Sequence, residues 1–336
     1  MLFPFCIQAQ AQTGIAEIPP EIPPQIPVVA QMPTPPPTSL FEELKTPFLI
    51  KPFFELPTYS FYLGAPDIKG YAFVPNYATR LGITLGWKAT QLTVAFALPI
   101  PKEELDRRGN SDQQSIILHT RWREHAIDFY SQYYRGLYAG NPLTEFSFSK
   151  PERFTQFPDA SVSNIGANFY YVFDEAHYSP RAAFDQTKIP LSNGGSWFAM
   201  PFLNYLVLDM GDKIIVGSES DAIQTKPDIN HLQLVSLGST FGYGHTWLIP
   251  NYHSSFSVQS SIGPAIQSQT VENPNTATER TLGVSGKWGF KICLAHNTTE
   301  DIWGARIFTD TLYSRLGSLD IYSTVMSGQL FYGYRF

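Results

Sequence analysis

The sequence has little charge and no long apolar run. Of its 336 residues 15% are charged, against roughly 25% in an average soluble domain. No stretch approaches the roughly 18 to 20 apolar residues that a membrane-spanning helix needs. Lys and Arg form no long cluster and the net charge is −6, so we expect no nucleic-acid partner, because phosphate neutralisation needs clustered cations.

Chemistry-bearing motifs are also scarce. Of the two cysteines, Cys6 lies in the N-terminal segment, and Cys293 alone supports neither a disulfide framework nor a cysteine zinc site. The histidines show no i, i+4 pairs, and no phosphate loop is present. We therefore expect no catalytic residue, no metal site and no cofactor.

Aromatic residues are abundant instead. Phe, Trp and Tyr make up 15% of the chain, with 25 Phe and 18 Tyr. An aromatic-rich, charge-poor chain without a spanning helix has one membrane form, the β-barrel, in which closure pairs every backbone group.

The N-terminal part differs from the rest. Residues 1–12 predict either a truncated secretory signal, with Ala9-Gln10-Ala11 as a small-x-small cleavage pattern, or a disordered terminus. Residues 13–57 form a Pro-rich extension, for which a polyproline II tether is expected. We place this extension in the periplasm.

Residues 58–336 alternate between apolar and polar side chains. The clearest example is 281–295, where Leu282, Val284 and Trp288 share one face while Thr281 and Lys287 take the other. A soluble β-sandwich also alternates, but segments such as 232–248 are long enough to cross a membrane when tilted. The pattern predicts an all-β transmembrane antiparallel barrel of about twelve strands, with 10 to 14 allowed. That count includes a strand at 180–187, and it puts 209–231 outside the cell and 136–163 in the periplasm, although the latter is long for a periplasmic turn.

The last segment places aromatic residues at every second position. Tyr332, Tyr334 and Phe336 end the chain on one face. A terminal aromatic on an alternating strand resembles the C-terminal signature read by the bacterial barrel-assembly machinery. We therefore expect these residues to act as a membrane-insertion signal, with that machinery and outer-membrane lipids as partners.

The opposite faces of the strands would line the lumen. They carry most of the charged side chains of these segments, which gives a net positive lining. The candidate solute-binding residues are Arg80, Lys88, Arg121, Asp128, Lys287, Lys291, Arg306 and Asp310, accompanied by His119, Asp174 and Arg335. A cationic lining would favour a small anionic solute in a pore, whereas mutual pairing of the charges would plug the barrel instead.

Catalysis is the weaker interpretation. His245 and His253 lie near Ser254 and Ser255, but no nucleophile elbow is present. The leading hypothesis is a passive, porin-like pore or small-solute binding barrel in the bacterial outer membrane. The alternatives are a non-conducting structural or adhesive barrel that acts through 209–231 and, less favoured, a lipid hydrolase using His245 or His253.

Several short motifs match a known family. They are Val74-Pro75-Asn76, the Leu81–Trp87 strand, LTVAFALP, then Asp128, Gln132, Tyr134 and Gly136, and finally Arg181-Ala-Ala-Phe184 with Gly194-Gly195-Ser196. From about residue 73 the chain resembles the domain-of-unknown-function family 4421 of bacterial envelope proteins. The resemblance implies an outer-membrane or envelope protein and supplies no activity or catalytic residue. It does not extend to the Pro-rich tract.

Overall fold

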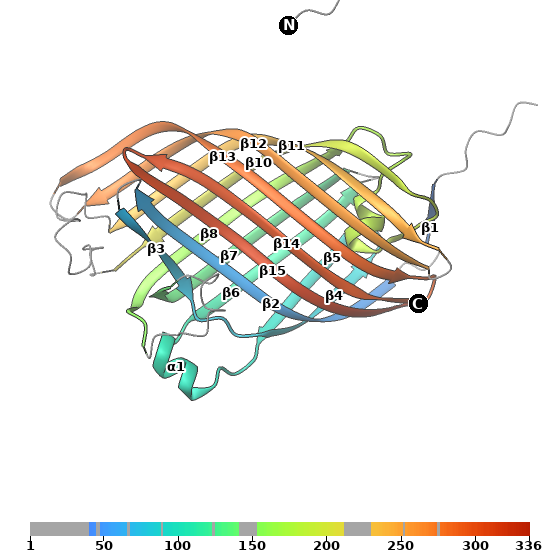
Figure 1. The fold of residues 1–336 in the computed structure, drawn as a ribbon, viewed down its shortest axis with the longest axis horizontal. Helices are drawn as coiled ribbons and strands as arrows, with labels where there is room; N and C mark the ends of the chain where they lie inside the picture. Colours follow the sequence, from blue (N-terminus) through green and yellow to red (C-terminus); the bar gives the residue numbers. More distant parts are fainter. Residues whose placement is uncertain are drawn as a thin grey trace, which may run out of the picture. The chain divides into compact units, whose positions relative to one another are not determined.

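Alternation along the chain produces a closed antiparallel wall. The computed structural model describes residues 40–44, 48–65, 68–88, 90–122, 125–140, 153–211, 230–250, 253–273 and 276–336. Within them, twelve strands form a ring that closes between its last and first members (Figure 1). The wall strands are β2 (Phe48–Ala65), β4 (Arg80–Trp87), β5 (Thr90–Ala97), β6 (Asp112–Trp122), β7 (His125–Ala139), β8 (Gln156–Val172), β10 (Gly194–Asp209), β11 (His231–Ile249), β12 (Ser254–Asn273), β13 (Thr276–Asn297), β14 (Asp301–Leu316) and β15 (Leu319–Arg335).

The predicted strand number is confirmed, although one predicted strand was wrong and one strand was missed. The segment 180–187 is not a strand: it contains a short π-helical turn, η1 (Arg181–Asp185), inside the barrel. The missing strand is β2, which begins at Phe48, ten residues before the barrel start drawn at 58. The sequence signals 1–12 and 13–39 lie outside the described residues.

Prolines conceal the start of β2 in the sequence. Pro52 pairs in register with Ile83 of β4 and has no register partner on β15. Pro57 falls in the stretch 56–60, which pairs with β15 alone, because the ladder to β4 ends at Glu55. Proline is tolerated where no ladder donor is needed, so both residues fit a wall strand.

The two ends of the barrel differ in their connections. We call the end that holds Phe48 and Phe336 the terminal end; there the backbone N–H of Phe336 donates to the carbonyl of Phe48 at 3.3 Å. Apart from the segment 173–193, the terminal end has short turns. The strand β7 ends and β8 begins at the opposite end, and so do β10 and β11. The placement of 136–163 at the same end as the termini was therefore wrong, because the missed strand β2 precedes it; the false strand at 180–187 then restored the even count of crossings.

An extra strand interrupts the ring near the opposite end. The strand β3 (Ile68–Pro75) pairs with β2 through Phe61 to Ala65 and with β7 through Phe73 to Pro75. Between its ladders to β4 and β3, β2 has no strand beside it on that side. The Tyr77 hydroxyl accepts a hydrogen bond from the backbone N–H of Tyr59 in this gap. This contact satisfies a buried donor that the ladder leaves open.

The single α-helix of the described residues, α1 (Lys102–Arg108), lies in the β5–β6 connection at the opposite end. The Asn76 side chain holds it by donating to the carbonyls of Glu104 at 3.2 Å and Gly109 at 2.8 Å. Close by, Gly136 has φ +78°, and a Cβ there would lie 2.2 Å from the Asn110 carbonyl oxygen. Among the described residues no helix is both long and apolar enough to cross a membrane.

Candidate functional site: a closed chamber in the lumen

The lumen is closed at the opposite end by apolar side chains. Many inward-facing residues of this layer are apolar and pack into one buried cluster, and buried polar side chains such as Gln267 and Gln269 lie beside them. Its members include Tyr59, Phe61, Leu63, Phe73, Tyr134, Leu137, Val162, Leu206, Leu208, Met210, Leu232, Leu234 and Ile321. We call this apolar cluster the seal.

The segment 173–193, which we call the plug, closes the terminal end from within. Its Tyr178, Ala183 and Phe184 pack against inward-facing wall residues such as Phe198 and Phe331. The strand β9 (Lys188–Pro190) within the plug pairs with β1 (Phe41–Glu43). The plug is therefore joined to the chain that leads into the first wall strand.

Wall side chains hold the tip of the plug through polar contacts. Arg121 forms a bidentate ion pair with Asp185, with Nε–Oδ2 at 2.5 Å and Nη2–Oδ1 at 3.2 Å. Lys51 Nζ donates to Gln186 Oε1 at 3.0 Å, and Arg335 donates to the Gln186 carbonyl. Gln186 is fully buried with φ +56°, and such a backbone conformation persists only where its surroundings enforce it.

The charge of Asp185 depends on this pairing. Burial alone would raise the pKa of the Asp185 carboxyl, but the Arg121 guanidinium outweighs burial and holds that pKa below its ordinary value. Asp185 is therefore ionised near neutral pH, and the plug tip carries a negative charge that the wall neutralises.

Between the seal and the plug lies a polar chamber of about 210 Å³. Of the eight lumen candidates predicted from the sequence, all but Lys88 line it. Lys88 lies exposed in the β4–β5 turn, where its ammonium sits 5.1 Å from the Trp87 ring. Of the additional candidates, His119 lines the chamber, Arg335 holds the plug, and Asp174 lies in the plug with its side chain half exposed.

Most of the chamber charges are paired. Arg80 lies 3.8 Å from Glu55, and Lys287 lies 3.0 Å from Asp310. Asp128 accepts from Arg121 and from His119 Nδ1, at 2.5 and 2.8 Å. Five cationic side chains and four acidic ones line the chamber when His119 is counted as neutral: Arg80, Arg121, Lys287, Lys291 and Arg306 against Glu55, Asp128, Asp185 and Asp310.

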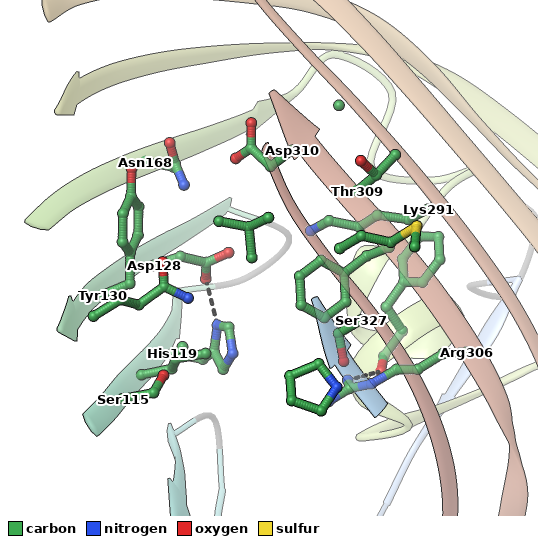
Figure 2. Close-up of a pocket in the computed structure, with 18 of the residues that line it drawn as sticks. Ser115, His119, Asp128, Tyr130, Asn168, Lys291, Arg306, Thr309, Asp310 and Ser327 are labelled. Atoms are coloured by element: carbon green, nitrogen blue, oxygen red, sulfur yellow. Dashed lines mark hydrogen bonds and ion pairs between the residues drawn. The ribbon is translucent and has the colours of Figure 1, made fainter. Parts of the chain in front are cut away.

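Two cations of the chamber differ from the others. No ion pair joins Lys291 or Arg306 to a carboxylate among the described residues. Lys291 lies 5.0 Å from the Tyr170 ring, and Arg306 Nε donates to Gln329 at 2.6 Å. Figure 2 shows both on one side of the cavity, with His119 and Asp128 on the other. Neither cation forms an ion pair in the described part of the chain, although Asp128 lies near enough to attract the Lys291 ammonium, so part of their positive charge is available to an anion.

Sequence reasoning missed several buried polar residues of the lumen, among them Lys51, Glu55, Asp185 and Asn204. Lys51 and Glu55 precede residue 58, and Asp185 belongs to the segment taken as a strand. Leu49, Lys51, Phe53 and Glu55 share one face of the strand and alternate with bulky residues on the other face. This alternation was the signal that could have revealed Lys51 and Glu55. Asn204 is uncharged and gave no signal.

The histidines of the hydrolase hypothesis lie outside the chamber. The His245 ring contacts Tyr243 and Trp247, with a ring-centroid distance of 4.3 Å to Trp247. His253 is exposed at the β11–β12 turn. The serine near a histidine is Ser254, 3.3 Å from His296, so neither proposed histidine is paired with a serine in a described contact.

The outward face of the barrel wall exposes large apolar side chains. Residues such as Ile262 and Leu282 expose 70% and 77% of their surface, and no charge interrupts the outward row Tyr332, Tyr334 and Phe336. Aromatic side chains gather on the outer surface toward the terminal end: Trp87, Trp197, Tyr243, Trp247, Phe256, Trp303, Tyr332, Tyr334 and Phe336. The exterior is therefore apolar, while the interior holds buried charged and polar side chains beside its apolar clusters, unlike a soluble protein.

Together these features define a closed β-barrel with an apolar exterior and a plugged, charged interior. The chain belongs to the family "Domain of unknown function (DUF4421)", whose model matches residues 50–336. The resemblance inferred from the sequence is thus confirmed, and the match includes nearly all of β2.

Solved structures with a similar arrangement are remote. The outer membrane protease OmpT of Escherichia coli shares 8% identity at a TM-score of 0.41, over 86% of this chain and 97% of that one. The toluene transporter TodX of P. putida shares 7% at a TM-score of 0.29, over 86% and 90% of the two chains. The attachment invasion locus protein Ail of Yersinia pestis shares 10% at a TM-score of 0.20, over 87% and 100%. These values say nothing about what this chain binds or does, and no curated protein matches it.

Proposed function

We propose that this protein is a bacterial outer-membrane barrel that binds a small anionic solute in a closed internal chamber. The observation that carries the proposal is the position of Lys291 and Arg306, two cations without an ion-pair partner among the described residues, in the cavity between the seal and the plug. A passive pore would need a continuous aqueous path, and the seal and the plug, which lie on either side of the cavity, favour binding over passage.

The outer-membrane location is supported by the surface. A closed ring leaves no sheet edge, and an apolar outer face favours lipid over water. Periplasmic turns are short in such barrels, so the terminal end faces the periplasm, and the Pro-rich extension lies there with it. The exposed row Tyr332, Tyr334 and Phe336 is available to the assembly machinery as an insertion signal.

Solute entry requires one end to open, and we assign this to the plug. The tip residues Asp185 and Gln186 are held by hydrogen bonds from side chains, each with a net contribution of about 0.5 to 3 kcal/mol because water replaces them. The seal at the opposite end consists of wall residues whose separation would break the ladder itself. Exchange with the periplasm is therefore the easier route.

Calorimetric titration of the refolded barrel in detergent micelles tests the proposal. Cyclohexanecarboxylate, a ring-sized monoanion, serves as the probe, with empty micelles as the blank. We expect saturable binding that Lys291→Met and Arg306→Gln each weaken by about tenfold, as loss of one charge-assisted hydrogen bond predicts. The matched control Arg135→Gln removes an exposed arginine outside the chamber and should leave binding unchanged. Absence of binding, or equal loss in the control, contradicts the proposal.

A further inference from the structure

The barrel wall contains a split between two neighbouring strands. The β5–β6 ladder ends at the pair that Thr93 forms with Ile117. Beyond this pair, residues 94–97 pair only with β4 and residues 112–116 pair only with β7, so no ladder joins these two described edges. The connection that contains α1 then links the two separated strand ends (Figure 1). We call the unjoined edges 94–97 and 112–116 the split.

The split lies in the lipid-facing band of the wall. The neighbouring outward side chains Val94, Phe96 and Ile116 are apolar and are 40%, 68% and 60% exposed. Unjoined backbone edges are unfavourable against hydrocarbon, and at membrane depth they are tolerated where they border a polar cavity or other protein groups. The inward side chains beside the split, Ala95 and Ser115, line the chamber. The chamber therefore extends to the wall at this point.

Small side chains leave the inner side of the split uncovered. Ala95 and Ser115 face inward yet are only half-buried. In contrast, the inward-facing Ser261 and Ser327 of the fully paired strands β12 and β15 are 5% and 2% exposed. The lining is thus looser beside the split than elsewhere in the chamber.

Specific hydrogen bonds keep the start of β6 away from the end of β5. Gln113 of β6 accepts a hydrogen bond from Arg80 Nη2 at 3.1 Å and donates to the carbonyl of Asn76 at 3.0 Å. The same Asn76 side chain holds α1. The beginning of β6 is therefore anchored to the chain around α1 and to β4, and the split is a built feature of the wall.

The two cations without ion pairs lie across the chamber from β6. Figure 2 shows Ser115 and His119 of β6 on one side of the cavity, and Lys291 and Arg306 on the other. An anionic head group that enters between β5 and β6 would face these cations, while an alkyl chain attached to it would still reach the lipid.

We infer that the chamber takes its anion from the membrane through the split, and that the ligand is an amphiphile such as an alkyl carboxylate. Its carboxylate would lie against Lys291 and Arg306, and its alkyl chain would leave between β5 and β6. This inference rests on the proposed function and adds an apolar chain to the anion. The plug remains the route for solutes that arrive from water. The split opens onto lipid, which conducts no ions, so it leaves the barrel electrically closed.

Photolabelling of the unchanged barrel in phosphatidylcholine vesicles tests the inference. The probe is dodecanoate with a diazirine in its alkyl chain, and labelled peptides are identified by mass spectrometry with and without excess cyclohexanecarboxylate. Label that cyclohexanecarboxylate displaces comes from chains whose head group occupies the chamber. We expect this displaceable label on 94–97 and 112–116. Displaceable label confined to the plug, or no displaceable label at all, overturns the inference.

Calorimetry with cyclohexanecarboxylate distinguishes this failure from failure of the proposed function. Saturable binding of cyclohexanecarboxylate without displaceable label in the split overturns the membrane route and leaves the anion chamber intact. Absence of both the binding and the label overturns the proposed function as well.

A variant then assigns the path of the alkyl chain. Ala95→Phe fills the inner side of the split, and we expect it to reduce displaceable labelling at least about tenfold, the equivalent of about two buried methylene groups. Ala199→Phe is the matched control, because Ala199 is also half-buried but lies on β10, which is paired on both sides. Heat-modifiable mobility on gels shows whether each variant is folded, and the labelling of the unchanged barrel does not depend on that result. Equal labelling of the two folded variants overturns the split as the path.

Discussion

Replacement of Arg121 by methionine should release the plug without unfolding the barrel. In the closed state Arg121 is bidentate to Asp185, and both side chains are more than nine-tenths buried. Removing one partner of a buried ion pair is unfavourable by about 3 to 5 kcal/mol, because the remaining charge is left unpaired. Opening of the plug hydrates Asp185 and relieves that penalty. At about 3 kcal/mol, the population of the open plug should rise by about 100-fold.

A natural thiol reports on this opening. Cys293 is 1% exposed and lies beneath the plug tip, with its sulfur 3.5 Å from Gln186 Nε2. In a Cys6→Ser background, alkylation of Cys293 by a maleimide measures the open population when closing is faster than labelling. We expect labelling of Arg121→Met to be about 100-fold faster than that of the parent. In Asp185→Asn, Arg121 keeps Asp128 as a partner, so an acceleration of about tenfold is expected.

Arg135 provides the matched control for Arg121. Arg135→Met removes an exposed arginine whose partner Asp159 is also exposed, at 3.4 Å, and surface pairs contribute only about 0 to 1 kcal/mol. Its labelling rate should stay within about threefold of the parent. If Arg121→Met labels Cys293 no faster than this control while running as a folded barrel on gels, the ion pair does not hold the plug.

Three further predictions concern pH, the gap in the wall and a glycine. Because the folded-state pKa of Asp185 is depressed, its contribution to the stability of the folded state is complete above the unfolded pKa of about 3.9 and is lost as pH falls below that value. The near-UV circular dichroism should therefore be constant from pH 8 to 5 and change only under more acidic conditions. A transition between pH 8 and 5 would contradict this expectation. Tyr77→Phe removes the acceptor for the Tyr59 N–H and should lower the free energy of unfolding in urea by about 1 to 3 kcal/mol; an unchanged midpoint would show that another group accepts this bond. Gly136→Ala combines a positive φ with a clash against the Asn110 carbonyl and should reduce the folded yield on refolding, whereas Gly328→Ala, where a Cβ meets nothing within 4 Å, should not.

Alternation revealed the wall because each strand has one lipid-type face and one lumen-type face. This is why β13 and β15 were predicted almost to their ends, and why seven of the eight charged lumen candidates line one chamber. The rule fails where alternation is weak or local breakers dominate. Pro52 and Pro57 concealed β2, since the sequence does not show that one ladder is absent beside them.

The plug could not be predicted from local pattern. Residues 180–187 contain apolar side chains that serve a buried turn as well as a strand, and the contacts that decide between them come from distant strands. Lys51 and Gln186 are separated by 135 positions, and Arg335 and Gln186 by 149. Charge pairing across the lumen has the same origin, so the sequence indicated a net positive lining but could not show that most of its cations are paired.

Single-channel recording in planar lipid bilayers tests the central claim most directly. An apolar seal at one end and a plug at the other predict that the inserted, folded barrel shows no discrete conductance steps at any applied voltage that the bilayer tolerates. Plug variants such as Arg121→Met should also remain silent, because the seal at the opposite end persists. Stable, anion-selective steps from the parent protein would contradict the closed chamber and restore the pore as the function of this barrel.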